Sequence, residues 1–123
     1  MRYTKITTDR RGGSRFEEVE VPQASTPFAE NMPPVLVSAA IAATSIVFVT
    51  TPSEVRETLP HPAPRRQFGV VLEGAVEIET SDGDKRTFAP GMVALVEDVD
   101  GQGHVLRVVS PTPATLMFVP IAD

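Results

Sequence analysis

His61 and His104 are the residues of this chain with the most versatile chemistry, and the 123-residue sequence contains no other histidine. Histidine gains and loses a proton near neutral pH, so it can act as a general acid or base, and it can also bind a metal. The chain has no cysteine, which excludes disulfides, thiolate metal sites and a cysteine nucleophile. We therefore expect any site chemistry to be organised around the two histidines.

His61 belongs to a stiff segment, LPHPAPRRQ, at residues 59–67. A residue that precedes proline is held in an extended conformation, and the side chains of an extended chain alternate between its two faces. His61 therefore shares one face with Ala63, Arg65 and Gln67. Because the prolines within this segment lack an N–H group, we expect it to lie at a sheet edge or a barrel rim.

Two registers are open to this segment. If the shared face points inward, His61, Arg65 and Gln67 line a cavity. If the register is shifted by one residue, Arg66 and Phe68 point inward instead. We favour the first register, because the second one buries the charged side chain of Arg66 beside apolar neighbours.

His104 follows a loop that is preceded by Glu97 and begins at Asp98, so two carboxylates stand at its start. Two of the three residues before His104 are glycines, which place no side-chain restraint on the backbone. We therefore expect Asp98–Gly103 to be more mobile than the strands and to close over the mouth of a cavity as a lid.

The elements that must position these residues are predicted to be β-strands. Twelve prolines and eight glycines are scattered through the chain and separate short runs of β-forming residues, a pattern typical of an antiparallel all-β domain. The expected strands are Tyr3–Thr8, Arg15–Val21, Thr44–Thr51, Gln67–Leu72, Ala75–Thr80, Lys85–Phe88, Met92–Val96, His104–Val109 and Thr115–Pro120. The expected connections include a loop at 23–34, extended chain at Val35–Ala43, and a loop at Pro52–Leu59 with a helical turn at Glu54–Glu57.

Composition sets the broad class of the protein. The chain has the length of a single domain, and 41% hydrophobic with 22% charged residues is ordinary for a soluble globular protein. A net charge of −5 argues against a nucleic-acid-binding surface. The absence of an apolar run of about 18 residues argues against a membrane span, and the N-terminus lacks an apolar signal core, so we expect a cytoplasmic location.

The span 61–109 resembles the cupin superfamily, whose first motif is G-x5-H-x-H-x3,4-E-x6-G. Counted back from Gly74, the glutamate of the motif falls on Gln67, and its two histidines fall on His61 and Ala63. The resemblance implies a small antiparallel β-barrel of the double-stranded β-helix or jelly-roll type.

The second cupin motif, roughly G-x5-P-x-G-x2-H-x3-N, is matched loosely by Gly83, Pro90-Gly91 and a displaced His104. Within the superfamily the chain resembles short bacterial members with an EDxxGxGH loop, matched here by residues 97–104. The resemblance implies a single domain over 1–123, in which 1–34 form an N-terminal hairpin and loop, a candidate dimer arm, and 35–123 form the barrel.

A typical metal cupin offers three histidines and one glutamate, and this chain departs from that pattern. It offers His61, Gln67 and His104, with Ala63 at the position of the second histidine. Glutamine is neutral and a poor ligand for a transition metal. We therefore expect no resident cofactor, and weak binding of a divalent metal at the three candidate ligands is the alternative.

Three functions compete for this cavity. The first is a non-redox small-molecule enzyme, a cyclase, isomerase or lyase, with His61 and His104 as acid–base groups and Arg65 orienting an anionic oxygen. The second is a small-ligand-binding cupin without catalysis, and the third is a weakly metal-dependent cupin oxygenase. The residues expected to contact the ligand are Gln67, Ala63, Glu97 and Asp98.

Each of these side chains is also compatible with a purely structural role, for example as a surface charge or a satisfied buried polar group. The functional interpretation depends on the fold directing several of them into one pocket. The expected partners are a small-molecule ligand and a second copy of the chain, because small cupins often pair through edge strands. The candidate interface is formed by Tyr3–Thr8 and Arg15–Val21.

Overall fold

The computed structural model describes residues 1–55 and 57–122, and all regular structure within them is β-strand, which confirms the all-β prediction. The strands are β1 (Arg2–Thr8), β2 (Ser14–Glu20), β3 (Gln23–Thr26), β4 (Val35–Ser38), β5 (Val47–Thr51), β6 (Gln67–Glu73), β7 (Val76–Thr80), β8 (Lys85–Phe88), β9 (Val93–Val96), β10 (His104–Val108) and β11 (Ala114–Pro120). Within these described residues there is no helix that could cross a membrane.

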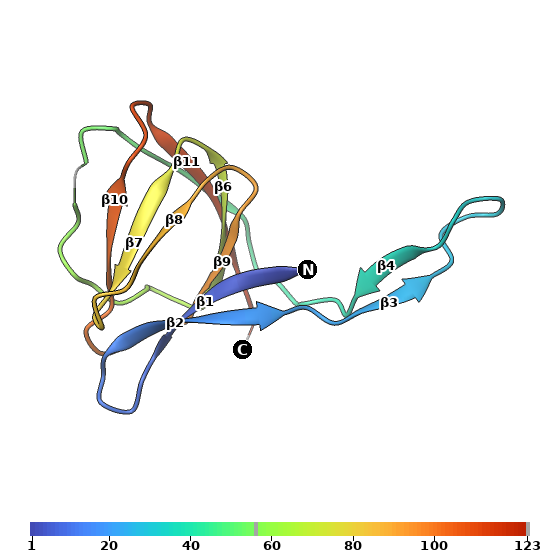
Figure 1. Ribbon diagram of the computed structural model, residues 1–123, viewed down its shortest axis with the longest axis horizontal. Coiled ribbons are helices and arrows are strands. Elements are labelled where there is room, and N and C mark those ends of the chain that lie inside the picture. The colour runs from blue at the N-terminus through green and yellow to red at the C-terminus, as the bar shows by residue number, and fades with distance from the viewer. Residues whose placement is uncertain (56, 123) are drawn as a thin grey trace.

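Two sheets lie face to face and enclose the hydrophobic core (Figure 1). One has six strands in the order β2-β1-β9-β6-β11-β5, and the other has three in the order β10-β7-β8. All pairings are antiparallel except that of β1 with β9. No ladder joins the two sheets into a closed barrel among the described residues, so the fold is an open, two-sheet form of the barrel that the sequence predicts.

Hydrophobic alternation explains which faces meet in the core. Along β7 the burial pattern alternates between Val76, Ile78 and Thr80, which are buried, and two glutamates, which are partly exposed. The buried residues that pack together come from both sheets, and they include Ile6, Val71, Val76, Ile78, Phe88, Val96, Val108 and Leu116. Strands with one apolar face are expected to pack in this way.

A hairpin formed by β3 and β4 projects from the two sheets as an arm (Figure 1). We define the arm as residues 23–38. The prediction of a loop at 23–34 was wrong for Gln23–Thr26, because the sequence QAST has little β propensity and gains its strand structure only by pairing with Val35–Ser38. The predicted helical turn at Glu54–Glu57 includes residue 56, which lies outside the described residues.

The first two strands belong to the main sheet rather than to the arm. β2 pairs with β1 along its whole length, and β1 pairs in parallel with β9. Of the N-terminal residues 1–34, those that follow β2 leave the main sheet and enter the arm. The N-terminal part expected at 1–34 is therefore divided between the main sheet and the arm.

Candidate functional site

A cavity of about 120 Å³ lies between the two sheets. Its lining is almost entirely apolar, from residues such as Val71, Ile78 and Leu116. The only side chains with hydrogen-bonding groups in this lining are those of His61, Gln67 and His104. Any recognition of a ligand inside the cavity by side-chain hydrogen bonds therefore involves these three groups.

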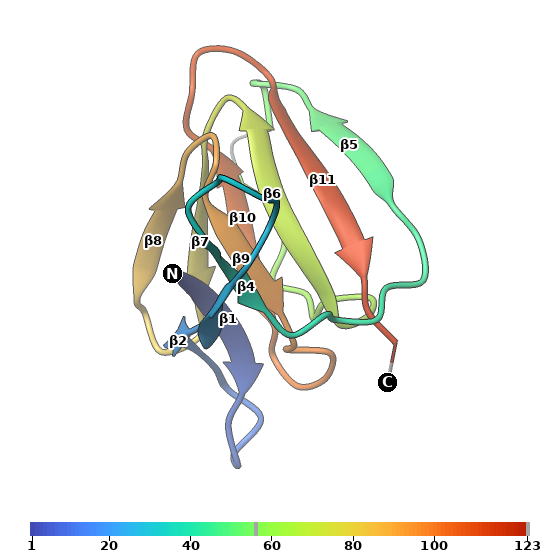
Figure 2. The same ribbon diagram turned by 90° about the vertical axis from the view of Figure 1, so that its right-hand side faces the viewer.

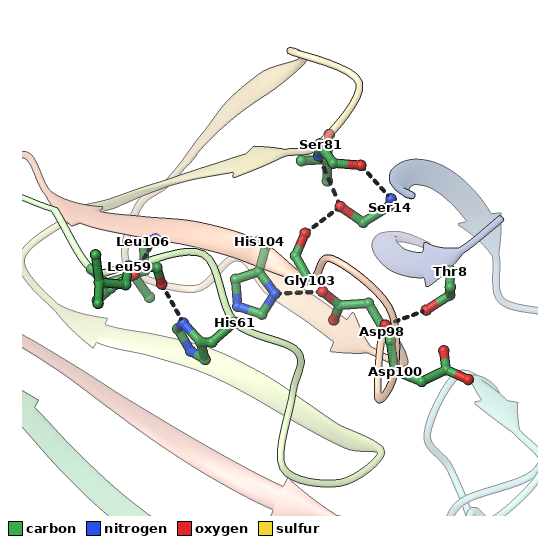
Figure 3. Close-up of polar contacts among 12 residues, drawn as sticks. Thr8, Ser14, Leu59, His61, Ser81, Asp98, Asp100, Gly103, His104 and Leu106 are labelled. Carbon is green, nitrogen blue, oxygen red and sulfur yellow. Dashed lines mark hydrogen bonds and ion pairs between the residues drawn. The ribbon is translucent and has the colours of Figure 1, made fainter. Parts of the chain in front are cut away.

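His104 begins β10, and its imidazole ring is held by the buried carboxylate of Asp98 (Figure 3). Nδ1 of His104 lies 2.6 Å from Oδ2 of Asp98. Because a carboxylate oxygen accepts hydrogen bonds, Nδ1 is assigned as the donor, and whenever the ring is uncharged its lone pair is on Nε2. His104 lines the cavity and Asp98 does not, and Nε2 is the ring nitrogen that the bond to Asp98 leaves available.

Asp98 is an unusual residue to bury. Its side chain has no exposed surface, and Oδ1 is the only buried side-chain polar atom without a hydrogen-bond partner in the part of the chain that is described. An unsatisfied buried polar atom costs about 1–3 kcal/mol. Such atoms in native proteins call for an explanation, and the other oxygen of this carboxylate, Oδ2, is bonded to His104.

His61 lies beside His104, with 5.1 Å between ring centroids and 47° between ring planes. Its Nδ1 is 2.8 Å from the carbonyl oxygen of Leu59 (Figure 3). A carbonyl can only accept, so this ring also carries a proton on Nδ1 and leaves Nε2 for other partners. His61 is exposed and also lines the cavity, which therefore reaches solvent beside this ring.

Backbone hydrogen bonds fix the two histidines relative to each other. The amide of His61 donates to the carbonyl of His104 at 3.1 Å, and the amide of His104 donates to the carbonyl of His61 at 3.0 Å. The amide of Ala63 donates to the carbonyl of Asp98 at 2.9 Å. The proline-containing segment is thus attached directly to the loop that carries the carboxylate.

Gly103 makes the contact between these two segments possible. A Cβ atom at this position would lie 2.0 Å from both the carbonyl carbon and the carbonyl oxygen of His61, and φ of Gly103 is +70°. Only glycine tolerates both conditions. Gly101 has a similar role, because its Cβ would lie 2.3 Å from the carbonyl oxygen of Gly12.

Hydrogen bonds join the loop Asp98–Gly103 to the first hairpin. The hydroxyl of Ser14 donates to the carbonyl of Gly103 at 2.6 Å, and the hydroxyl of Thr8 donates to the carbonyl of Asp100 at 3.2 Å (Figure 3). The amide of Gln102 donates to the carbonyl of Gly12 at 2.8 Å. The glycines that suggested a mobile lid thus allow close packing, and the loop supports His104 from outside the cavity.

The structure separates the other predicted site residues into two groups. Ala63 is buried and lines the cavity as expected, whereas Arg65 is exposed and is not part of the lining. Glu97 lies outside the cavity, where it pairs with Arg66 at 2.8 Å and with Lys5 at 3.9 Å. The chain bends at 64–66, so the strict alternation that placed Arg65 on the face of His61 and Gln67 does not continue through it.

A typical metal cupin holds its metal with histidine and glutamate side chains, so the side chains available around this cavity decide whether a metal fits here. No group of three or more histidine, aspartate or glutamate side chains comes together as a metal site within residues 1–55 and 57–122. The cavity offers two imidazoles and the neutral amide of Gln67, and Ala63 contributes no ligand. A catalytic zinc or iron site needs at least three good protein ligands. The residues present therefore do not fit a resident catalytic metal.

No family model matches the chain, and no curated protein matches it. One solved structure that matches is described as "Crystal Structure of FeII HppE", with 19% identity and a TM-score of 0.41 over 62% of this chain and 42% of that one. This chain thus spans less than half the length of that protein's chain. At this similarity the match carries no inference about activity, and the likeness to cupins stays an interpretation of the sequence motifs.

Proposed function

We propose that the protein is a non-redox enzyme that moves a proton within a small, mostly apolar substrate, as an isomerase, lyase or cyclase does. The observation that carries this proposal is the Asp98–His104 pair. A fully buried carboxylate is bonded to one edge of an imidazole ring, and the residue that carries this ring lines the cavity. A carboxylate so placed fixes the tautomer of the ring and counters the charge that the ring gains with a proton.

His104 is suited to the role of general base. In the proposed reaction its Nε2 removes a proton from a carbon next to a substrate carbonyl, and the electron pair of the C–H bond moves into an enolate. The same proton is then delivered to another atom of the substrate; alternatively, Nε2 of His61 takes up a proton from water and delivers it, and His104 releases its own proton to water. The substrate gains and loses one proton, so no oxidant or reductant is needed.

The other two polar groups of the cavity complete this chemistry. His61 lies beside His104 and reaches solvent, so it can act as a proton donor that exchanges with bulk water. The amide of Gln67 is suited to donate a hydrogen bond to the enolate oxygen. Arg65, which the sequence suggested for that role, is not part of the cavity lining.

The cavity limits the size and polarity of the substrate. Its volume of about 120 Å³ is close to the roughly 150 Å³ of an engineered apolar cavity that binds benzene. The lining is apolar apart from the two histidines and Gln67. We therefore propose a substrate about as large as benzene that carries a carbonyl and no fixed charge.

A ligand-binding protein without catalysis is the second candidate, and the same apolar cavity favours it. The two candidates differ in what happens to a carbon-bound proton of the ligand. Cyclohexanone is a suitable probe, because it matches the cavity in size and has exchangeable protons next to a carbonyl. Exchange of these protons for deuterium in D₂O is followed by NMR, with protein that lacks a polyhistidine tag.

We expect the wild type to accelerate this exchange. The acceleration should fall by about 10²- to 10⁴-fold in His104→Asn, the range that general base catalysis contributes. Asp98→Asn should also be impaired, whereas Asp100→Asn, a matched change at an exposed position of the same loop, should not. Binding of cyclohexanone without accelerated exchange would favour the second candidate. Unchanged acceleration in His104→Asn would exclude the proposed base.

A further inference from the structure

In the arm at residues 23–38, β3 and β4 form a separate two-stranded sheet that pairs with no other strand among the described residues. It is a two-stranded hairpin whose residues are exposed with the exception of Thr26, and Leu36 at its centre is 65% exposed. A two-stranded hairpin without a further strand or a packed face is marginally stable in water. An arm of this kind is expected to be ordered by contacts with another surface.

The outer face of the six-stranded sheet is a second apolar surface. Gln67, Gly69 and Val71 of β6 line the cavity, so Phe68 and Val70 point to the opposite side. Across the strands, Val70 pairs with Met117 and Met117 pairs with Phe48. These side chains therefore form an apolar row over β6, β11 and β5. Phe48, on the edge strand β5, is 66% exposed.

The arm projects from the same side of the molecule as this outer face. In Figure 1 the arm leaves on the side of β6, β11 and β9, away from β10 and β7, and Figure 2 looks onto β6 and β11 from the side of the arm. An apolar groove of about 450 Å³ lies at the root of the arm, lined by Tyr3, Val19, Val37 and Ile41 among others. The groove lies between the arm and the main sheet, and residues of both line it.

One long segment of this region, residues 31–53, carries no charge. Between Glu30 and Glu54 the chain contains no charged residue, although 22% of all residues are charged. The segment includes half of the arm and all of β5. Depletion of charge in an exposed apolar surface is typical of a protein–protein interface. An uncharged segment also offers no ion-pair partner to a strongly charged protein or nucleic acid.

We propose that the partner is a second copy of this chain, packed against the outer face of the six-stranded sheet and clasped by the arm. A two-fold axis places the arm of each copy beside the outer face of the other, so that one contact covers the apolar residues of both surfaces. The interface then continues onto β5 and covers an edge strand that is otherwise exposed. It differs from the interface expected at Tyr3–Thr8 and Arg15–Val21, where β1 pairs on both sides and β2 forms the opposite edge of the same sheet.

Analytical ultracentrifugation of the full chain tests this proposal. The wild type should sediment with twice the monomer mass of 13.2 kDa. The double variant Leu36→Glu/Phe48→Glu, which introduces charge on the arm and on the outer face, should raise the dissociation constant of the dimer by about thirtyfold or more. Val109→Glu is the matched control, because Val109 is 47% exposed and follows β10 in the other sheet. A monomeric wild type, or equal weakening by the control, would overturn the proposal.

Hydrogen exchange of the unaltered protein gives a second readout that does not depend on any variant. Amides of the arm should become more protected as the protein concentration rises through the dissociation constant, while amides of β7 in the three-stranded sheet should not change. Arm protection that is independent of concentration would contradict the proposal, because it would mean that the hairpin is ordered without a second copy.

Discussion

Nδ1 of His104 and Oδ2 of Asp98 lie 2.6 Å apart, and the carboxylate is completely buried. The two residues are separated by the loop whose glycines pack against the backbones of His61 and Gly12. This packing explains the EDxxGxGH pattern residue by residue. The aspartate binds the histidine, the glycines allow close contacts, and Glu97 pairs with Arg66 outside the cavity.

The first prediction concerns the tautomer of His104. Asp98→Asn keeps the shape of the side chain, but an amide can donate as well as accept, so it no longer forces the proton onto Nδ1. Nitrogen-15 NMR should show a single Nδ1–H tautomer for neutral His104 in the wild type and a mixture in the variant. Asp100→Asn, with the same chemical change in the same loop, should leave the wild-type signal. A single tautomer in all three proteins would mean that Asp98 does not control the ring.

The second prediction concerns the glycine before His104. Gly103→Ala places a methyl group 2.0 Å from the backbone of His61 at a φ of +70°, so it should lower the free energy of unfolding by about 3 kcal/mol or more. Gly83→Ala is the control for backbone strain, because Gly83 has a φ of +88° and no atom within 4 Å of an added Cβ. It should cost about 1 kcal/mol. Urea unfolding measures both, and equal costs would argue against the packing role of Gly103.

The third prediction tests the geometry around Ala63, which lines the cavity with both histidines. Ala63→His adds a third imidazole and should raise the affinity for zinc or nickel, since imidazole is a favoured ligand. It should also fill part of the cavity and impair the native function. Isothermal titration of the metal into the variant and the wild type measures the difference. Equal affinities would show that position 63 does not face the histidine pair.

The fourth prediction separates two adjacent arginines. Arg65 is exposed and absent from the cavity lining, so Arg65→Ala should change the free energy of unfolding by no more than about 0.5 kcal/mol and leave ligand binding unchanged. Arg66 pairs with Glu97, whose side chain is only 19% exposed. Arg66→Ala should therefore cost about 1 kcal/mol. A large loss of function in Arg65→Ala alone would instead support the register in which Arg65 points into the cavity with His61 and Gln67.

The fifth prediction concerns pH. The hydroxyl of Thr80 donates to Asp82 at 2.6 Å, and this hydrogen bond lowers the pKa of Asp82 below its usual value. A carboxyl whose pKa is lowered by folding stabilises the fold above its unfolded pKa, and this stabilisation is lost as the pH falls through the folded pKa. Thr80→Val should cost about 0.5–1 kcal/mol at pH 7, since Asp82 is exposed. The loss of stability caused by Thr80→Val should be smaller near pH 2, where Asp82 is protonated. An equal loss at both pH values would show that the hydrogen bond from Thr80 does not lower the pKa of Asp82.

Much of the fold follows from the sequence because its signals are local. Runs of β-forming residues end at turn residues, and the strands predicted on this basis match β1, β2, β5, β6, β7, β8, β9, β10 and β11 to within a few residues. The stiffness of the segment around His61 is equally local, since it comes from prolines. The sequence therefore indicates two histidines in one all-β domain and places them on opposing segments.

Only the tertiary structure decides where the loop side chains point. Asp98 binds His104 instead of a ligand because contacts with Thr8, Gly12 and Ser14, all distant in sequence, hold the loop. Arg65 turns away because the chain bends where it meets the sheet, and no alternation rule includes such a bend. The arm becomes a hairpin because Gln23–Thr26 finds a partner strand in Val35–Ser38. Each of these outcomes depends on non-local packing, whereas propensity and periodicity describe only neighbours along the chain.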